Sequence, residues 1–474
     1  MELSRRICLV RLWLLLLSFL LGFSAGSAIH WTEQEGKEIW DYVTVRKDAH
    51  MFWWLYYATN PCKNFSELPL VMWLQGGPGG SSTGFGNFEE IGPLDTQLNP
   101  RNTTWLQWAS LLFVDNPVGT GFSYVNTTDA YAKDLNTVAS DMMVLLKSFF
   151  DCHEEFQTVP FYIFSESYGG KMAAGISLEL YKAIQEGTIK CNFSGVALGD
   201  SWISLGHSVL SWGPYLYSMS LLDNQGLAEV SDIAEQVLNA VNKGFYKEAT
   251  QLWAKAEMII EKNTDGVNFY NILTKSTPES AMESSLEFIW SPLESGWPQT
   301  RRAPPTSASG ALGLKVRLCQ RHVRHLQGDA LSQLMNGPIK KKLKIIPEDI
   351  SWGAQSSYVF ISMEGDFMKP AIDIVDKLLA AGVNVTVYNG QLDLIVDTMG
   401  QESWLQKLKW PQLSKFNQLK WKALYTDPKS SETSAFVKTY ENLAFYWILK
   451  AGHMVPSDQG EMALKMMRMV TEQE

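Results

Sequence analysis

The chain has 474 residues, of which 46% are hydrophobic and 19% are charged, a composition typical of globular rather than disordered proteins. This length allows one large domain with an inserted subdomain, or two domains. The formal net charge of −10 disfavours non-specific nucleic-acid binding, and the sequence has no sustained stripe of Lys and Arg. The short basic run from Lys340 to Lys344 is more typical of a solvated helix face than of a phosphate site.

The first residues have the pattern of a cleaved signal peptide. Three arginines precede an apolar run from Leu12 to Phe23, and small residues follow from Ser24 to Ala28. The run is shorter than the ~20 residues that a membrane-spanning helix needs. We therefore expect residues 1–28 to be removed, and the mature chain to enter the secretory pathway without stable membrane insertion.

Glycosylation sequons agree with this route. One sequon is close to chance level, but five of them together with a signal peptide predict a glycoprotein. The acceptor asparagines are Asn64, Asn102, Asn126, Asn192 and Asn384.

Four cysteines, Cys62, Cys152, Cys191 and Cys319, remain once Cys8 leaves with the signal peptide. They allow three pairings, and the sequence alone does not choose among them. A Cys152–Cys191 disulfide is mildly favoured because the two bracket one apparent helix–strand–helix unit. Free buried thiols are the alternative.

Short apolar runs alternate with helical patterns up to about residue 200, and the same alternation resumes after residue 350. Helices are predicted over Asp134–Phe150 and Lys171–Ile184. Buried strands that alternate with helices predict an α/β sheet with a largely parallel centre. The predicted strands are Phe52–Tyr57, Leu70–Leu74, Leu111–Val114, Phe161–Phe164, Ser357–Ile361, Val383–Tyr388 and Leu443–Leu449.

The stretch from Trp202 to Asp349 is mostly helical in pattern, as in Leu227–Glu261, and lacks clear strand runs. The simplest interpretation is a helical cap over residues 202–349, inserted between two parts of an α/β core at 29–201 and 350–474. Within the cap, residues 291–314 are rich in Pro, Ser, Gly and Arg, which predicts an irregular loop or linker.

A candidate nucleophile lies in the motif Ser165-Glu-Ser167-Tyr-Gly169, directly after the predicted strand Phe161–Phe164 and just before a helix. A serine on a sharp turn between a strand and a helix is the nucleophile elbow of the α/β-hydrolase fold. Ser165 occupies the position at which glycine is usual, so we expect some strain there.

The general base is expected close to the C-terminus. In this fold the order along the chain is serine, then an acid, then histidine. His453 follows the last strand run, as that order requires. Three other histidines after the serine, His207, His322 and His325, fall in the cap-like region and are interpreted as structural or solvated.

The acid must lie between Ser167 and His453 and hold the imidazole in the correct tautomer. Asp393 follows the predicted strand Val383–Tyr388, so it ends the penultimate core strand. Asp366 is the main rival and Asp397 a weaker one. Placement favours Asp393.

A glycine-rich run, Gln75-Gly-Gly-Pro-Gly-Gly-Ser-Ser82, follows another predicted strand. It lacks the lysine of a phosphate-binding loop, whereas exposed backbone N–H groups suit an oxyanion hole. One donor is expected from this loop and the other from the N–H of Tyr168, after the nucleophile. No metal or cofactor is expected.

Five motifs in this order resemble the serine carboxypeptidases of the carboxypeptidase Y and cathepsin A type, over most of the mature chain. The resemblance implies an exopeptidase that removes C-terminal residues from peptides through an acyl-enzyme. The motifs are Trp73-Leu-Gln-Gly-Gly-Pro-Gly-Gly-Ser-Ser, Val114-Asp-Asn-Pro-Val-Gly-Thr-Gly-Phe-Ser-Tyr124, Glu166-Ser-Tyr-Gly-Gly, Asn389-Gly-Gln-Leu-Asp and Gly452-His-Met-Val-Pro-Ser-Asp-Gln459.

The resemblance also implies a site for the C-terminal carboxylate of the substrate, built from Trp73, Gln75, Glu90 and Glu166, and it matches Gly77 and Tyr168 to the oxyanion donors. Carboxyls that face a carboxylate cannot all be ionised, because like charges raise one another's pKa. Protonated glutamic acids would donate hydrogen bonds to the substrate. Binding is therefore expected to be strongest at acid pH, in a secreted or lysosomal setting. For Glu90 and its neighbour Glu89, a solvated loop carboxylate is the alternative.

Three features depart from the family pattern. Gln75 stands where the family usually has Asn, and Gly80 where it usually has Cys, so the disulfide at that position is absent. Residues 291–314 match nothing in the family and suggest a processing loop or a variant insertion.

Two other functions remain open. An esterase could use the same triad, but it would have no substrate carboxylate for Glu166 and Glu90 to bind. A glycoprotein with weak or absent turnover could act as a binding or protective partner. The expected partners are peptides with a free C-terminus, and a homodimer is compatible with the sequence.

Overall fold

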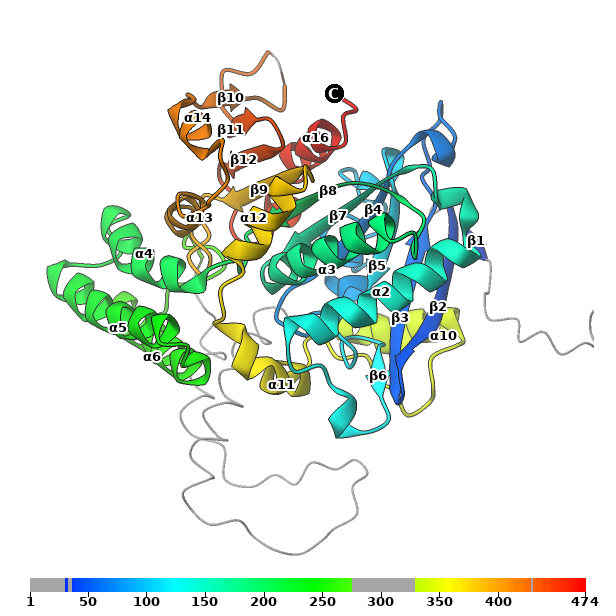
Figure 1. The fold of residues 1–474 in the computed structure, drawn as a ribbon, viewed down its shortest axis with the longest axis horizontal. Coiled ribbons are helices and arrows are strands. Elements are labelled where there is room, and N and C mark those ends of the chain that lie inside the picture. Colours follow the sequence, from blue (N-terminus) through cyan, green and yellow to red (C-terminus); the bar gives the residue numbers. More distant parts are fainter. Residues whose placement is uncertain (1–29, 33–35, 275–328, 428) are drawn as a thin grey trace, which may run out of the picture.

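The computed structural model describes residues 30–32, 36–274, 329–427 and 429–474 (Figure 1). The predicted signal peptide, Cys319, His322, His325 and the segment 291–314 lie outside the described residues.

The described strands form one twelve-stranded sheet with a parallel centre. Along the sheet the order is β1-β2-β3-β5-β4-β7-β8-β9-β12-β11-β10, and β6 pairs with β3. The strands from β5 to β12 in this order run parallel, and both flanks are antiparallel. The bounds are β1 (His30–Thr32), β2 (Gly36–Arg46), β3 (Ala49–Tyr56), β4 (Leu70–Leu74), β5 (Ser110–Val114), β6 (Tyr124–Val125), β7 (Pro160–Glu166), β8 (Asn192–Gly199), β9 (Val385–Gly390), β10 (Lys422–Leu424), β11 (Ala435–Tyr440) and β12 (Leu443–Ile448).

Helices cover both faces of the sheet, which explains why the central strands are apolar throughout. In β4, Leu70, Met72 and Leu74 belong to one hydrophobic core and Val71 and Trp73 to the other, because successive side chains alternate in direction. Helices α2, α3 and α12 cover the first face, and α9, α10 and α16 contribute to the second core (Figure 1). The helix bounds are α2 (Leu135–Cys152), α3 (Tyr168–Gln185), α4 (Leu205–Ser218), α5 (Asn224–Asn242), α6 (Tyr246–Thr264), α9 (Asp329–Leu334), α10 (Lys340–Leu343), α11 (Ser357–Phe367), α12 (Ile372–Ala380), α13 (Thr398–Leu405), α14 (Leu413–Gln418), α15 (Val455–Asp458) and α16 (Gly460–Val470).

Six of the seven predicted strands are present, and the parallel centre is confirmed. The prediction of a strand over Ser357–Ile361 is wrong, because these residues begin α11. Ser356 accepts a hydrogen bond from the Val359 N–H and so caps the helix. The buried residues Val359, Met363 and Phe367 recur every four positions, which is a helical spacing.

Between β8 and β9 the described residues contain helices and no strand. The single helical pattern expected over Leu227–Glu261 is two helices, α5 and α6, which turn at Gly244 with a positive φ of 76°. Helices α4, α5 and α6 pack side by side beyond one end of the sheet (Figure 1). Of all helices in the described part of the chain, none is both long and apolar enough to cross a membrane.

The favoured Cys152–Cys191 disulfide is not formed. Cys62, Cys152 and Cys191 are all free thiols, the first two exposed and the third half-buried. Cys152 ends α2, which packs on β2 and α3, whereas Cys191 leads into β8, which packs on α3. Helix α3 therefore lies between the two elements that carry these cysteines.

A buried ion pair attaches the start of α3 to α11. Lys171 Nζ lies 2.7 Å from Asp366 Oδ2, and the Tyr168 hydroxyl donates to the same oxygen at 2.8 Å. Burial lowers the pKa of Lys171 to about 8, against the charge of Asp366. Burial alone would raise the pKa of Asp366, but the charge and hydrogen bond of Lys171 lower it below its ordinary value. The pair holds the turn before α3 in place.

Asp366→Asn should destabilise the fold strongly, because it leaves the buried Lys171 ammonium without its counter-charge. Breaking one partner of a buried pair costs about 3–5 kcal/mol. Asp373→Asn is the matched control, because Asp373 forms an exposed pair with Lys377, and exposed pairs contribute about 1 kcal/mol or less. Thermal unfolding of the two variants measures the difference, and equal melting temperatures would contradict the role of the buried pair.

Candidate active site

The residues expected to carry the chemistry lie at the carboxyl ends of neighbouring parallel strands. Ser167 follows β7, Asp393 follows β9 and His453 follows β12, and these strands are consecutive in the sheet apart from β8, which lies between β7 and β9. The glycine-rich run follows β4, on the other side of β7. Parallel strands present their carboxyl ends at one edge, where ligands bind in open α/β sheets.

Ser167 lies in the turn between β7 and α3, with φ 61° and ψ −131°. A positive φ strains a non-glycine residue and is typical of a nucleophile raised above a sheet. The turn is tight because α3 starts close to β4: a Cβ on Gly169 would lie 2.2 Å from the Leu74 carbonyl oxygen. Glycine is therefore required at this position.

The strain expected at Ser165 is absent. Ser165 lies within the regular strand β7 and has no positive φ. Its hydroxyl donates to the Ala197 carbonyl at 2.8 Å, and its carbonyl accepts from the Tyr388 hydroxyl at 2.9 Å. The strand accommodates a serine here because its hydroxyl and its carbonyl are both paired, and the residue with a strained backbone is Ser167.

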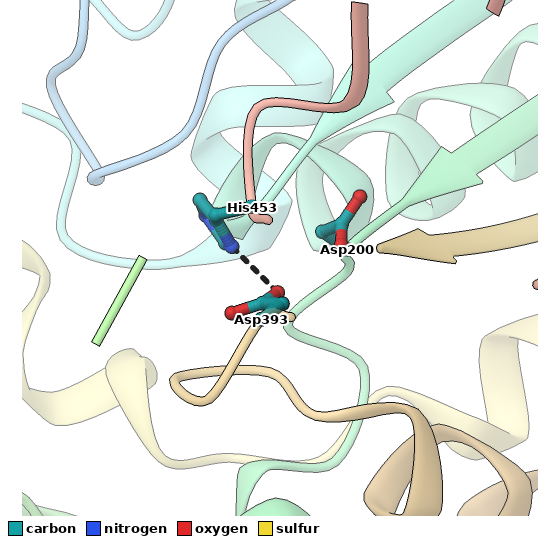
Figure 2. A group of neighbouring side chains, drawn as sticks. All are labelled: Asp200, Asp393 and His453. Carbon is teal, nitrogen blue, oxygen red and sulfur yellow. Dashed lines mark hydrogen bonds and ion pairs between the residues drawn. The ribbon is translucent and has the colours of Figure 1, made fainter. Parts of the chain in front are cut away.

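His453 and Asp393 form a buried pair beside the serine. His453 Nδ1 lies 2.8 Å from Asp393 Oδ2, and the side chains are 2% and 0% exposed (Figure 2). The Val396 N–H donates to Asp393 Oδ1 at 3.2 Å. Because the carboxylate accepts from Nδ1–H, Nε2 is the free basic nitrogen. His453 and Ser167 line the same cavity.

The rival acids have other roles. Asp366 pairs with Lys171 in the first turn of α3. Asp397 caps α13, accepting from the Gly400 N–H at 2.9 Å and from the Ser211 hydroxyl at 2.7 Å. Burial raises the pKa of Asp397 to about 7. Neither side chain hydrogen-bonds His453.

Gly77 and Tyr168 present backbone N–H groups that donate no hydrogen bond to the described residues. Tyr168 begins α3, so its N–H is one of the free donors of a helix N-terminus. The loop that carries Gly77 is anchored by the buried Asp115, which accepts from the Ser81 hydroxyl at 2.7 Å and from the Thr83 N–H at 3.1 Å. Two unpaired donors beside a serine suit a developing oxyanion.

A hydrogen-bond chain leads from the core to the residue before the nucleophile. Trp73 Nε1 donates to Gln75 Oε1 at 2.7 Å, and Gln75 Nε2 donates to Glu166 Oε1 at 2.8 Å. Gln75 and Glu166 line the cavity, whereas Trp73 is fully buried behind them and orients the Gln75 amide. Glu166 Oε2 has no donor from the protein.

Glu90 is fully buried against Glu166 and Gln75, and of the two carboxyls only Glu166 lines the cavity. Burial and then the charge of Glu90 raise the pKa of Glu166 well above its ordinary value. Burial likewise raises the pKa of Glu90, although Glu166, Gln75 and the charge of His453 act in the opposite direction. Burial raises the pKa of Glu89 to about 7, with the charge of Glu90 as the second cause. The pair formed by Glu90 and Glu166 therefore retains a proton at acid pH.

Asp200 is a fourth buried carboxyl at this edge, and no sequence pattern marked it. It follows β8 with a positive φ of 42°, and ligand atoms of Asp200, Asp393 and His453 all lie within 4.8 Å of one another (Figure 2). Asp200 Oδ1 accepts from the Gly390 N–H at 2.8 Å, and Oδ2 has no donor from the protein. Burial, and then the charge of Asp393, raise the pKa of Asp200 well above its ordinary value. A neutral Asp200 can donate its proton to the Asp393 carboxylate.

The remaining wall of the cavity is largely apolar. Trp202, Trp253 and Phe367 line it as a compact aromatic group, with ring centroids 4.7 to 5.7 Å apart. Trp253 lies on α6 and Phe367 ends α11, so the helices after β8 contribute directly to the cavity. Tyr270 adds an edge-on contact with the His453 ring at 5.1 Å.

A family model described as serine carboxypeptidase, Peptidase S10, matches residues 30–473. The chain belongs to the serine carboxypeptidase family. It is 89% identical over its full length to the whole of mouse retinoid-inducible serine carboxypeptidase, and 78% identical to the whole of the human protein of that name. Among solved structures it resembles the prohormone-processing carboxypeptidase Kex1(delta)p of Saccharomyces cerevisiae, with a TM-score of 0.74 and 21% identity over 93% of this chain and 92% of that one. The resemblance expected from the motifs and the α/β-hydrolase fold are thereby confirmed.

Replacement by asparagine should have little effect at Asp200 and a large effect at Asp393. Asp200→Asn should keep the rate of Ser167 labelling by a fluorophosphonate within about threefold of wild type, because the amide still donates to Asp393. Asp393→Asn should slow labelling by up to ~10⁴-fold, because the amide cannot stabilise the imidazolium. Labelling rates from pH 5 to 8 measure both effects without a substrate carboxylate. A comparable loss in the two variants would show that Asp200 acts as a charged group.

Proposed function

We propose that this protein releases C-terminal residues from peptides at acid pH, as a serine carboxypeptidase with Ser167 as the nucleophile. The observation that carries the proposal is the buried carboxyl pair of Glu90 and Glu166, of which Glu166 directly precedes Ser167 and lines the same cavity. An α/β-hydrolase needs only the triad and the oxyanion donors for acyl transfer. Two carboxyls that retain a proton add a site for an acceptor group on the substrate, and a free C-terminal carboxylate is such a group.

In the proposed mechanism, Ser167 Oγ attacks the last peptide carbonyl while His453 Nε2 takes the hydroxyl proton. Asp393 holds the imidazole through Nδ1 and stabilises the imidazolium. The Gly77 and Tyr168 N–H groups bind the oxyanion of the tetrahedral intermediate. His453 then returns the proton to the leaving amine, and water hydrolyses the acyl-enzyme by the same steps.

The carboxylate site explains the preference for acid pH. Glu166 binds the substrate carboxylate only when its carboxyl is protonated and Oε2 can donate. Because the pKa of Glu166 is raised, the donor form persists well above the pH at which an ordinary glutamic acid ionises, and it is lost as the pH rises through the raised value. The Gln75 amide, oriented by Trp73, supplies a second donor to the same carboxylate.

The proposal also includes the cap, the signal peptide and the cellular location that the sequence predicts. We propose that α4 to α6 belong to a cap inserted into the core, that residues 1–28 direct the chain into the secretory pathway, and that the enzyme works in a secreted or lysosomal setting. All five sequon asparagines are exposed, which supports glycosylation at each. A homodimer remains compatible with the sequence.

The first test compares a peptide acid with its C-terminal amide at pH 5. The free acid should be cleaved at least ~10-fold faster, because the amide leaves the buried carboxyl pair without its partner. Ser167→Ala should abolish cleavage of both while keeping the melting temperature. Product analysis by mass spectrometry measures the rates, and equal rates for acid and amide would favour an esterase-like hydrolase.

The second test concerns pH. Glu166→Gln should retain the wild-type KM at pH 5 within a few-fold, because the amide also donates. Above its pKa the wild-type KM should rise by up to about tenfold per pH unit, and the variant should show a smaller rise. Glu179→Gln, at an exposed residue paired with Lys182, is the control. Parallel KM profiles for the wild type and Glu166→Gln would contradict a protonated Glu166.

A further inference from the structure

A second cleft lies at the edge of the sheet opposite the active site. Pro160 begins β7, Asn192 begins β8 and Asn384 directly precedes β9, and all three residues line this cleft. Because these strands are parallel, the cleft lies at their amino ends, whereas Ser167 follows the carboxyl end of β7. The cleft has a volume of about 900 Å³. Sites for small molecules occupy about 300–1,000 Å³, so this cleft has room for a ligand.

Three of the five glycosylation sequons gather around this cleft. Asn192 and Asn384 line it and are exposed, and Asn64 is next to the lining residue Lys63. The other two acceptor asparagines do not line it. A glycan linked to an asparagine in the wall begins inside the cleft, so the chain itself supplies a ligand for it.

The acceptor amide of Asn384 is held by the wall of the cleft. Its Nδ2 donates to the Ser194 carbonyl at 3.0 Å, and the Asn384 carbonyl accepts from the Val196 N–H at 2.9 Å. An amide nitrogen carries two hydrogens, so one can be replaced by a sugar while the other keeps the bond to Ser194. The protein therefore sets the direction in which this glycan leaves. Asn192 is held less firmly, because its Nδ2 donates to the Thr158 carbonyl at 3.4 Å, outside the usual range of about 2.7–3.2 Å.

The lining of the cleft suits a neutral ligand with many hydroxyl groups. Tyr181 and Phe193 are half-buried in the wall and offer apolar ring faces, on which the C–H groups of a sugar ring can pack. The amides of Gln185 and Gln473 can donate to sugar hydroxyls and accept from them. The charged residues of the wall are one lysine and two glutamates, and these mixed charges select neither an anion nor a cation.

We propose that the first sugars of an N-linked glycan on Asn384 lie in this cleft and form part of the folded structure. The inference rests on the proposed glycosylation and is independent of the proposed catalytic mechanism. The sugars cover the half-buried rings of Tyr181 and Phe193, and the apolar surface that they remove from water stabilises the fold. A glycan on Asn126, an exposed residue directly after β6, extends into solvent instead.

The first test uses the glycoprotein from cells that make only oligomannose glycans, so that endoglycosidase H can act at every occupied site. In the native protein the Asn384 glycan should be trimmed at least ~10-fold more slowly than the Asn126 glycan, because its sugars must first leave the cleft. Mass spectrometry of the glycopeptides measures both rates. The denatured protein is the control and should show equal rates. Asn192→Gln should leave the Asn384 glycan protected, because the protein and not the neighbouring glycan covers it.

The second test removes the same glycan in two ways. Asn384→Gln removes the acceptor, whereas Thr386→Val removes the sequon hydroxyl and keeps the Asn384 amide. Each substitution should lower the melting temperature by about 2 °C or more. Each should leave kcat/KM unchanged, because the cleft lies at the opposite edge of the sheet from Ser167. Asn126→Gln is the matched control and should keep the wild-type melting temperature.

Trimming of the native Asn384 glycan at the rate of the Asn126 glycan overturns the inference, as does loss of its protection in Asn192→Gln. Unchanged melting temperatures in Asn384→Gln and Thr386→Val also overturn it. An unglycosylated Asn384 in the wild type would overturn the proposed glycosylation of that residue, and the inference with it. The glycopeptide masses show which of these has failed.

Discussion

Buried carboxyl groups at the ends of the central strands determine the chemistry of this site. Glu166 ends β7, Asp200 and Asp393 follow the neighbouring strands β8 and β9, and Glu90 is buried beside Glu166. In the described part of the chain none of the four forms an ion pair with a lysine or arginine. Buried carboxyls this close to one another cannot all be ionised, because burial and like charge both raise their pKa values, so some retain their protons. In the proposed mechanism the same effect serves two purposes. Glu166, which lines the cavity, offers a proton to the substrate, and Asp200 offers one to Asp393 beside His453.

The fold makes this arrangement possible through close approach at one edge of the sheet. Ser167 can project into the cavity because the turn after β7 has a strained positive φ, and Gly169 lets α3 start against β4. The Lys171–Asp366 ion pair fixes the first turn of α3, which follows Ser167. Helices α6 and α11 place Trp253 and Phe367 in the cavity wall, so the cavity that Glu166 lines also has an apolar side. Recognition of a charged terminus and of an apolar side chain can therefore occur in one cavity.

Much of the site follows from sequence, because the family motifs lie directly after strands with strong apolar patterns. The placements of Ser167, Asp393 and His453 after β7, β9 and β12 are examples. Asp200 was not predicted as a site residue, because Ser194 and Gly195 weaken the apolar pattern of β8 and no strand is predicted to end before it. The first residues of α11 are aromatic and β-branched, so their pattern predicts a strand. Only the cap at Ser356 and the four-residue spacing of the buried side chains that follow indicate a helix. The bridge between Gln355 and Gly80 was not predicted, because it joins segments 275 residues apart and no local pattern reveals it.

The central claim is that a protonated carboxyl binds the substrate's C-terminal carboxylate. The most direct measurement is calorimetric titration of Ser167→Ala with a peptide acid, in buffers of different ionisation enthalpy, from pH 5 to 8. The account predicts net proton uptake on binding as the pH rises, because the incoming carboxylate raises the pKa of the carboxyl pair further. It also predicts that uptake falls when Glu166 is replaced by Gln and vanishes for the peptide amide. Binding of the acid without proton uptake at any pH in this range would contradict it.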